Sequence, residues 1–416
     1  MTAFTALLPA AVLLAAATVL PPPATAATDP DASATATPAA PATPAAPAAP
    51  ATAIAPAVAP YVVVLKEAGA RAPLRALAAE AAEAGDQVGA VYDTVLDGFA
   101  VRTTAARAAA LAADPRVASV EPDAEFRTSD TQTQTSAPWP LDRIDQRELP
   151  LDGAYAYATK AQGVTAYIVD TGINTLHQEF GGRARTGYNA LFLEGSADCN
   201  GHGTHVAGTV GGATYGVAKG VSLVAVKVAD CRGAGRLSAI LKGLEWMVRD
   251  AAKAPRTPAV ANMSIGGTPS FALDSAVKRA VRAGITFTVA AGNDASNACA
   301  GSPARVPQAL TVGATDAGDR RAPFSAYGPC VDLSAPGVAV TSAWKGSRTA
   351  LARATGTSMA APHVTGVAAL ILASGAAKTP AQVSEVLVRS ALRDHVSGLP
   401  AGTPNLLLHL PGGDPA

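Results

Sequence analysis

Two patterns of apolar and polar positions divide the chain near Trp139. Before it, between Tyr61 and Phe126, short apolar runs alternate with alanine-rich amphipathic segments. The apolar runs predict strands, at residues 61–65, 87–92, 98–101 and 117–120. The amphipathic segments predict helices, at residues 72–84 and 104–113, which Gly85 and Pro115 bring to an end. This βαββαβ order indicates a small α+β module of the ferredoxin-like type.

After Trp139, continuous apolar runs of strand length alternate with segments of helical periodicity. Strands are predicted at residues 164–169, 223–228, 259–263 and 285–290. Helices are predicted at residues 237–249, 273–283 and 357–374. Apolar strands separated by helices indicate an α/β fold, with a mostly parallel sheet flanked by helices on both faces. In such folds ligands bind at the carboxyl ends of the strands, so candidate chemistry is sought there.

The first sixty residues have a different character. An apolar run from Ala6 to Leu20 is followed by prolines and by Ala24-Thr25-Ala26, which predicts a signal peptide over residues 1–27. No Lys or Arg precedes the run, and a buried apolar helix is the alternative. Residues 28–60 are almost entirely Ala, Pro and Thr, which predicts a semi-extended linker. The small module then covers residues 61–131 and the larger domain residues 132–416.

The bulk composition narrows the choice of partners. The chain of 416 residues has 32 basic and 32 acidic side chains, so a nucleic acid or an acidic polymer is not expected as a partner. The apolar residues are largely alanine, so mean hydropathy says little about membranes. With an export signal and no second apolar span, we expect a secreted, extracellular monomer without stable membrane association.

Three short segments carry candidate chemistry. Asp170-Thr171-Gly172 directly follows a predicted buried strand. Residues 200–208, Asn-Gly-His-Gly-Thr-His-Val-Ala-Gly, form a glycine-flanked entry into a helix of small residues. Ser358 lies at the start of the last predicted helix. A serine hydroxyl becomes a nucleophile when an imidazole accepts its proton, and a carboxylate orients that imidazole. A helix start also directs backbone N–H groups at a developing oxyanion.

Each segment alone is a weak signal, because Asp-Thr-Gly is usually a loop and small residues around Ser358 can serve only helix packing. The order Asp, His, Ser, with these local sequences, is far more specific, and it is the order found in subtilisin. The three segments resemble the signatures of the subtilisin-like serine peptidases, and within them the proteinase K group and its aqualysin-like enzymes. The resemblance runs from Ala137 to about Leu408.

The resemblance implies a secreted serine endopeptidase that acts on protein and peptide substrates through an acyl-enzyme. In it Asp170 orients, His202 is general base and then acid, and Ser358 attacks. His205 is the rival base by spacing alone, and the resemblance favours His202. We expect His205 and His363 to be packed, hydrogen-bonded histidines. Zinc binding by His202 and His205 lacks a His-Glu-x-x-His pattern.

The remaining site residues also follow from the resemblance. Asn293, after Ala290-Ala291-Gly292, is expected to supply the side-chain donor to the oxyanion, although Asn after Gly is also a common turn residue. Two glycine-rich segments are expected to pair with the backbone of a substrate, and two tight loops are the alternative. The expected substrate-binding residues are Gly233, Ala234, Gly235, Ser264, Ile265, Gly266 and Ala290.

Four cysteines allow three disulfide pairings in an exported protein. The resemblance implies the pairs Cys199–Cys231 and Cys299–Cys330. A zinc ion held by cysteines is the alternative, and no C-x-x-C spacing supports it. Cys199 lies three residues before His202, so its disulfide is expected to stiffen the loop that carries this histidine.

Structural calcium is expected at two places, and no catalytic cofactor is expected. Acidic and amide side chains in a loop soon after the start of the larger domain would supply one set of oxygen ligands, and a solvated acidic surface is the alternative. These residues are Asp142, Asp145, Gln146 and Asp152. The second site would combine Asp332 with main-chain oxygens of Pro303 and Arg305, by resemblance to relatives that bind calcium.

The small module resembles the inhibitor prodomain of these peptidases, so the chain is expected to be a zymogen that its own prodomain inhibits. The polar residues 128–136 lack apolar periodicity and are expected to be exposed, with a self-processing cut at 129–133. The module is also expected to assist folding, because a parallel sheet forms slowly from distant contacts. A catalytically silent relative that acts as a binding module is one alternative function, and an esterase is another.

Overall fold

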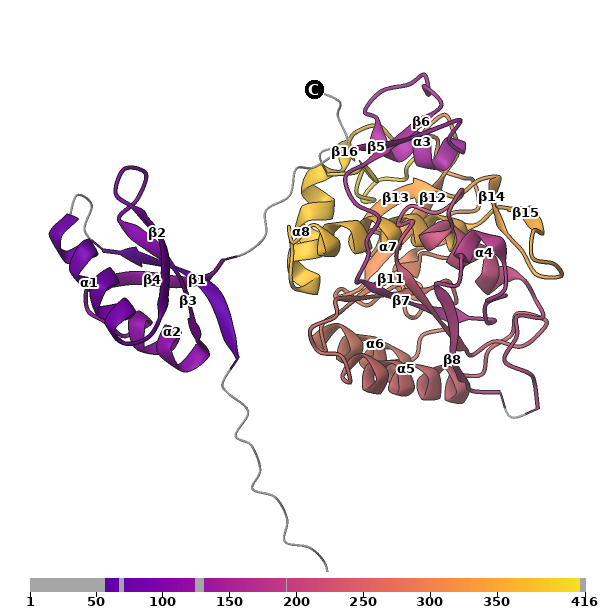
Figure 1. Ribbon diagram of the computed structural model, residues 1–416. Helices are drawn as coiled ribbons and strands as arrows, with labels where there is room; N and C mark the ends of the chain where they lie inside the picture. The colour runs from indigo at the N-terminus through magenta and orange to yellow at the C-terminus, as the bar shows by residue number, and fades with distance from the viewer. Residues whose placement is uncertain (1–56, 67–70, 124–130, 192, 412–416) are drawn as a thin grey trace, which may run out of the picture. The chain divides into compact units, whose positions relative to one another are not determined.

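The computed structural model describes residues 57–66, 71–123, 131–191 and 193–411, and the chain divides into two compact units after Glu125 (Figure 1). The predicted signal peptide, nearly all of the predicted linker, and residues 129 and 130 of the predicted processing region lie outside the described residues. Each unit is described by itself.

The first unit is the predicted α+β module. Its elements are β1 (Val58–Leu65), α1 (Arg71–Glu83), β2 (Gln87–Tyr92), β3 (Gly98–Thr104), α2 (Ala105–Ala112) and β4 (Val117–Pro122). The sheet has the order β2-β3-β1-β4, and all three pairings are antiparallel. Val63, Phe99 and Leu74 pack together from strands and helix into one core. The predicted βαββαβ order is confirmed.

The second unit is built on a nine-stranded sheet in the order β16-β17-β13-β12-β11-β10-β7-β9-β8. Its pairings are parallel except for that of β16 with β17. The strands are β7 (Thr165–Asp170), β8 (Ala184–Asn189), β9 (Ser222–Lys227), β10 (Ala259–Met263), β11 (Ile285–Ala290), β12 (Leu310–Thr315), β13 (Leu333–Pro336), β16 (Leu392–Arg393) and β17 (Leu406–Leu407).

Both faces of this sheet are covered, as the apolar strands predict. Along β7, Ala166 and Ile168 belong to one core, and Tyr167 and Val169 to the other, because successive side chains leave opposite faces. The first core includes α4 (His202–Gly211) and α7 (Thr357–Ala373), and the second includes α5 (Leu237–Ala251) and α6 (Phe271–Arg282). Figure 1 shows these helices around the sheet.

The strand order reverses at β7, which pairs with β9 on one side and β10 on the other. A reversal of this kind leaves a crevice at the carboxyl end of the strand, since the connections depart in opposite directions. Asp170 is the last residue of β7. The topology therefore places the first candidate residue where a parallel sheet offers a binding site.

The shorter elements are β5 (Gln132–Thr135), α3 (Trp139–Asp145), β6 (Ala154–Tyr157), β14 (Val340–Ala343), β15 (Leu351–Ala354), α8 (Pro380–Ser390) and the 3₁₀ turns Gln178–Phe180 and Ala298–Ala300. None of these short elements, nor β8, β12, β13, β16 and β17, was among the predicted strands and helices. Two further details differ from expectation. Part of the polar stretch is ordered, since β5 pairs with β6 in an antiparallel ladder, although three of its four residues are exposed as expected. Asp142 and Asp145 lie on α3 and not in a loop, because Pro140 starts a helix there that the sequence pattern had not indicated.

Candidate active site

Asp170 is fully buried at the carboxyl end of β7. Its Oδ1 accepts hydrogen bonds from the backbone N–H of Thr171, at 2.7 Å, and lies 2.8 Å from Nδ1 of His202. Its Oδ2 is buried without a hydrogen bond. The carboxylate is therefore held rigidly, and the side chain that it contacts is the imidazole of His202.

Two glycines explain how α4 brings His202 to this carboxylate. At Gly203, a Cβ would lie 2.2 Å from the carbonyl oxygen of Gly172, so only glycine lets the helix start approach the end of β7. Gly201 has φ of +106°, and a Cβ there would lie 2.4 Å from the ring of Trp344. The glycines on either side of His202 thus serve a close approach that larger residues would prevent.

The surroundings of His202 favour its charged form. Burial lowers the pKa of His202, but the charge and hydrogen bond of Asp170, together with the charge of Asp198, outweigh it, so the net pKa is raised. The side chain is 29% exposed, whereas that of Asp170 is 0% exposed. The imidazole is therefore held on its inner side and remains accessible on the other.

The rival base His205 faces away from this pair. Its Nε2 lies 3.0 Å from the carbonyl oxygen of Val340, and the residue is fully buried. Burial lowers the pKa of His205 to about 4, so it is neutral near pH 7. His363 is likewise buried, with Nδ1 2.9 Å from the carbonyl oxygen of Met359. Both are packed, hydrogen-bonded histidines, as expected.

Ser358 is the second residue of α7, in the first turn, where backbone N–H groups lack partners inside the helix. Its hydroxyl donates to the carbonyl oxygen of Ser264 at 3.2 Å, while Ser264 Oγ donates to the carbonyl oxygen of Ser358 at 2.9 Å. Within the described residues no hydrogen bond joins Ser358 to His202. In this resting arrangement the serine is tied to the segment after β10.

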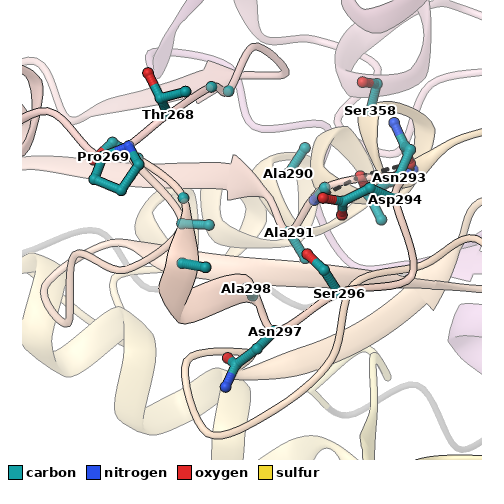
Figure 2. A pocket seen from close by; sticks show the side chains of 18 of the residues that line it. Thr268, Pro269, Ala290, Ala291, Asn293, Asp294, Ser296, Asn297, Ala298 and Ser358 are labelled. Atoms are coloured by element: carbon teal, nitrogen blue, oxygen red, sulfur yellow. Dashed lines mark hydrogen bonds between the residues drawn. The ribbon is translucent and has the colours of Figure 1, made fainter.

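The side chain of Asn293 is oriented by Thr357. Its Oδ1 accepts hydrogen bonds from the backbone N–H of Thr357 at 2.8 Å and from the hydroxyl of the same residue at 3.0 Å. With its oxygen occupied in this way, the amide NH₂ of Asn293 remains available to donate. Figure 2 shows Asn293 and Ser358 at the same end of one pocket.

That pocket has a volume of about 410 Å³. Small side chains dominate its wall, and Figure 2 shows Ala290, Ala291 and Ala298 among them. Ser264, Gly266 and Ala290 of the predicted substrate-binding residues line it, while Ile265 and residues 233–235 do not. Residues 233–235 are exposed and form a turn that Asp230 closes by accepting the N–H of Ala234 at 2.9 Å.

Both predicted disulfides are present. Cys199 and Cys231 are joined, as are Cys299 and Cys330. In the described part of the chain, three or more metal-ligand atoms of His, Cys, Asp or Glu approach within 4.8 Å of one another only at Glu194, Cys199 and Cys231. The disulfide uses both of these sulfurs, so this group is not a zinc site in the oxidised protein.

The first predicted calcium cluster has an oxygen without a partner. Asp142 accepts the N–H of Gly153 at 2.8 Å, and Gln146 Oε1 accepts that of Asp152 at 3.2 Å. Oδ1 of Asp145, by contrast, is buried without a hydrogen bond. Burial, together with the charges of Asp142 and Asp152, raises the pKa of Asp145 to about 7. A cation would relieve this repulsion and oxygen ligands suit calcium, although Asp142, Asp145 and Asp152 do not each bring an oxygen within 4.8 Å of the others.

The second predicted cluster has a single carboxylate. Burial raises the pKa of Asp332 to about 6, although Oδ2 accepts the N–H of Thr311 at 2.7 Å. The side chain of Arg305 is paired with Asp274 at 2.7 Å, so only the carbonyl oxygen of Arg305 could serve a cation. One carboxylate with main-chain oxygens is also compatible with calcium.

Sequence reasoning missed three buried polar residues beside the candidate site. Asp198 accepts hydrogen bonds from the loop that carries His202. Lys227 is buried, and its ammonium donates to the carbonyl oxygen of Thr171 at 2.7 Å. Asn262 donates to Ser264 Oγ at 2.9 Å. A charged or amide residue inside an apolar strand was the available signal for Lys227 and Asn262, since such residues are rarely buried without a partner.

Comparison with known proteins agrees with this architecture. Residues 161–408 match the subtilase family, and residues 60–129 match peptidase inhibitor I9. An extracellular serine proteinase of Thermus sp. (strain Rt41A) is 53% identical over 79% of this chain and 78% of its own length. Alkaline serine exoprotease A of Vibrio alginolyticus is 46% identical over 79% of this chain and 61% of its own length. The crystal structure of a cold adapted subtilisin-like serine proteinase is 50% identical, with a TM-score of 0.63, and the match covers 66% of this chain and 98% of that one.

The fold, the pocket beside Ser358 and these matches define a serine proteinase, which is a hydrolase. The unit before it is related to an inhibitor, so the chain has the organisation of a zymogen. The chain belongs to the subtilase family.

Proposed function

We propose that this protein is a secreted endopeptidase in which Asp170, His202 and Ser358 form the catalytic triad. The observation that carries the proposal is the 2.8 Å contact between His202 Nδ1 and buried Asp170, at the edge where Ser358 begins α7. A carboxylate on Nδ1 fixes the tautomer that leaves Nε2 free to accept a proton.

The reaction follows from these positions. The Ser358 hydroxyl leaves the carbonyl of Ser264, gives its proton to His202 and attacks the peptide carbonyl carbon. His202 then protonates the leaving amine, and an acyl-enzyme remains on Ser358. Water, deprotonated by His202, releases the acid product and restores the hydroxyl. Asp170 stabilises the imidazolium throughout and stays ionised.

Asn293 and the backbone N–H of Ser358 are proposed to bind the oxyanion. The contacts of Asn293 Oδ1 with Thr357 leave its NH₂ as a donor beside the start of α7. The helix start adds the positive end of its dipole. Both donors are fixed before the reaction, so they stabilise the negative charge without rearrangement.

The substrate is proposed to bind as an extended strand. Residues 264–266 and 233–235 would offer backbone groups to it, which gives affinity without strict sequence demand. The pocket wall of Gly266, Ala290 and Ala298 leaves room for a bulky apolar side chain before the scissile bond. Cleavage profiling on a mixed peptide library tests this, and a preference for glycine or alanine at that position would contradict it.

Covalent labelling tests the triad. A fluorophosphonate is expected to label the wild-type protein at Ser358 and to block peptide hydrolysis, whereas Ser358→Ala is expected to do neither. A folded wild-type protein that never labels would favour the silent-relative alternative. Comparison of turnover on a peptide and on a matched ester addresses the esterase alternative, because an esterase would leave the peptide intact.

Secretion and self-processing are parts of the same proposal. The extracellular relative and the two disulfides support export, and within the described ranges no helix is long and apolar enough to cross a membrane. The inhibitor-like unit is proposed to block the site until a cut at 129–133 releases it. A Ser358→Ala chain is expected to stay uncut and to be cut when active enzyme is added. Normal processing of the variant alone would contradict autocleavage.

Structural calcium is proposed at the two clusters described above. Asp142, Asp145, Gln146 and Asp152 would hold one ion, and Asp332 with the carbonyls of Pro303 and Arg305 another. The ions would supply charge compensation for buried carboxylates and take no part in the reaction. The pKa of Asp145, raised to about 7, supports the first site.

A further inference from the structure

Asp198 is a buried carboxylate that the mechanism above does not use. It lies four residues before His202 and is 7% exposed. Oδ1 accepts hydrogen bonds from the Thr171 hydroxyl at 2.9 Å and from the backbone N–H groups of Asn200, at 3.0 Å, and Gly201, at 2.8 Å. Oδ2 accepts from the backbone N–H and the hydroxyl of Thr204, at 2.9 Å and 2.6 Å. Five donors converge on one side chain.

These donors come from both sides of the Asp170–His202 contact. Thr171 follows Asp170 at the end of β7, and its hydroxyl also accepts the N–H of Gly203 at 2.9 Å. Gly201 and Thr204 flank His202 at the start of α4. Asp198 therefore ties the strand that carries the carboxylate to the helix that carries the imidazole.

The start of α4 needs such a partner. Its N-cap is Gly201, which has no side chain to accept the free N–H groups of the first turn. A larger residue is excluded there because a Cβ would meet Trp344. Asp198 supplies the missing cap from three residues earlier, and its negative charge suits the positive end of the helix.

The charge of Asp198 also reaches His202. Its hydrogen-bond donors are neutral hydroxyl and backbone groups, so no cation offsets its effect on the imidazole. The other charged or titratable groups around this loop are Asp170 on β7, His205 on α4, Lys227 on β9, Glu194 in the preceding loop and Lys345 after β14. His205 is neutral because burial lowers its pKa to about 4, and Glu194 lies 3.5 Å from the Lys227 ammonium and offsets its charge. Asp170 and Asp198 are the groups whose charge raises the pKa of His202 against the opposing effect of burial.

We propose that Asp198 is a positioning residue for the catalytic histidine. It locks the start of α4 onto the end of β7 so that His202 meets Asp170, and its charge favours the imidazolium that forms during acyl transfer. The inference rests on the proposed triad and adds a second carboxylate that acts through His202.

The test is the pH dependence of kcat/KM for the processed enzyme on a peptide substrate. Asp198→Asn removes the charge, so the acid limb is expected to move to lower pH as the pKa of His202 falls. It also replaces an acceptor by an NH₂ group beside Thr204, so kcat is expected to fall at least about tenfold while KM changes little. Asp198→Glu keeps the charge in an altered position, and it is expected to lower kcat without moving the acid limb.

Asp316→Asn is the matched control. Asp316 also closes a loop by accepting backbone N–H groups, from Gly318 at 2.9 Å and Arg320 at 3.0 Å, and it lies between β12 and β13, outside the segments that carry Asp170, His202 and Ser358. It is expected to keep the wild-type kcat and acid limb. If Asp198→Asn fails to fold, Thr171→Val removes one arm of the same link and is expected to lower kcat.

Two results overturn the inference. One is a folded Asp198→Asn enzyme with the kcat and acid limb of the wild type, and the other is a Thr171→Val enzyme with unchanged kcat. A wild-type protein that neither labels with a fluorophosphonate nor hydrolyses peptides contradicts the proposed function itself. An active wild type with an unaffected Asp198→Asn contradicts only the role of Asp198.

Discussion

Two acidic regions of the proteinase unit stabilise their buried carboxylates in different ways. In the His202 loop, each oxygen of Asp198 accepts several hydrogen bonds. At the second region, the charges of Asp142 on α3 and of Asp152 in the loop after it act on Asp145, and Oδ1 of Asp145 has no donor. The first region keeps its charge through internal donors and applies it to an imidazole. The second has fewer donors, since Oδ2 of Asp145 accepts the N–H of Ala156 but Oδ1 accepts none, and the proposed cation would offset the repulsion between its carboxylates.

The two regions are expected to affect different quantities, the first turnover and the second the melting temperature. Changes at Asp170 and His202 should alter turnover while the melting temperature stays close to that of the wild type. Changes at α3, or removal of calcium, should alter the melting temperature while the turnover of folded molecules stays unchanged. A substitution that strongly changed both turnover and melting temperature would contradict this separation of the two regions.

The largest effect is expected at Asp170. Asp170→Asn should keep the fold but allow the wrong tautomer of His202, so kcat should fall by about 10⁴-fold, as the equivalent change does in serine proteases. The acid limb of kcat/KM, which in the wild type should lie above pH 6.5 because the pKa of His202 is raised, should move to lower pH. Steady-state kinetics across pH measure both. A loss smaller than tenfold would show that another group orients His202.

The next effect is expected at Asn293. Asn293→Ala removes one proposed oxyanion donor, and the corresponding loss in subtilisin is about 10²–10³ in kcat. KM should change little, because the interaction forms mainly in the transition state. Thermal unfolding controls for the lost contacts with Thr357. If kcat stays normal while the protein is destabilised, Asn293 is only a turn residue.

Removal of calcium is expected to act on the second region and on the proposed site at Asp332, and not on the His202 region. Excess chelator should lower the melting temperature by about 5–10 °C at pH 8, since bound ions stabilise the folded state only. In chelator, stability should also fall as pH rises between 3.8 and about 7, because the unfolded chain loses the Asp145 proton first and the folded chain retains it. Calorimetry at pH 5 and pH 8 measures the difference. No shift with chelator at either pH would contradict both calcium sites.

The smallest effect is expected for Asp145→Asn. It removes the charge that calcium offsets, so in chelator at pH 8 the variant should melt a few degrees above the wild type. With calcium present, it should melt below the wild type because one ligand charge is lost. Its kcat should remain that of the wild type. Asp316→Asn, at a carboxylate outside both regions that pairs with Arg320 at 3.0 Å, is the control for the loss of a negative charge elsewhere in the unit.

Much of the fold could be predicted because local patterns carry it. The bounds of β2, β10 and β11 agree with the predicted strands, since continuous apolar runs end at turn residues there. Helix α3 was missed because its seven residues, Trp-Pro-Leu-Asp-Arg-Ile-Asp, are too few to show a helical period. The strand β5 was missed because its polar residues are ordered only by pairing with β6. Short elements of this kind depend on their partners more than on their own sequence.

Part of the candidate site could also be predicted from the sequence. The glycines around His202 and the order Asp, His, Ser are visible in the sequence, because a close approach demands small residues at fixed positions. Asp198 gave no comparable signal, since an aspartate in a loop of small polar residues is usually exposed. Its five donors come from residues up to 27 positions away, and only the folded chain brings them together.

The sequence by itself determined the two-unit organisation, the longer apolar strands and periodic helices, and the residues capable of acyl transfer. These depend on local periodicity and on residue chemistry, which need no knowledge of distant contacts. Spacing left His202 and His205 as rivals and the resemblance favoured His202, and the tertiary structure places His202 against Asp170. Only the tertiary structure showed that Asp198 lies beside them. It also decided that Asp145 keeps an oxygen without a donor. Each of these facts depends on which groups share a buried space, and burial sets both the charge of a side chain and the partner that it must find.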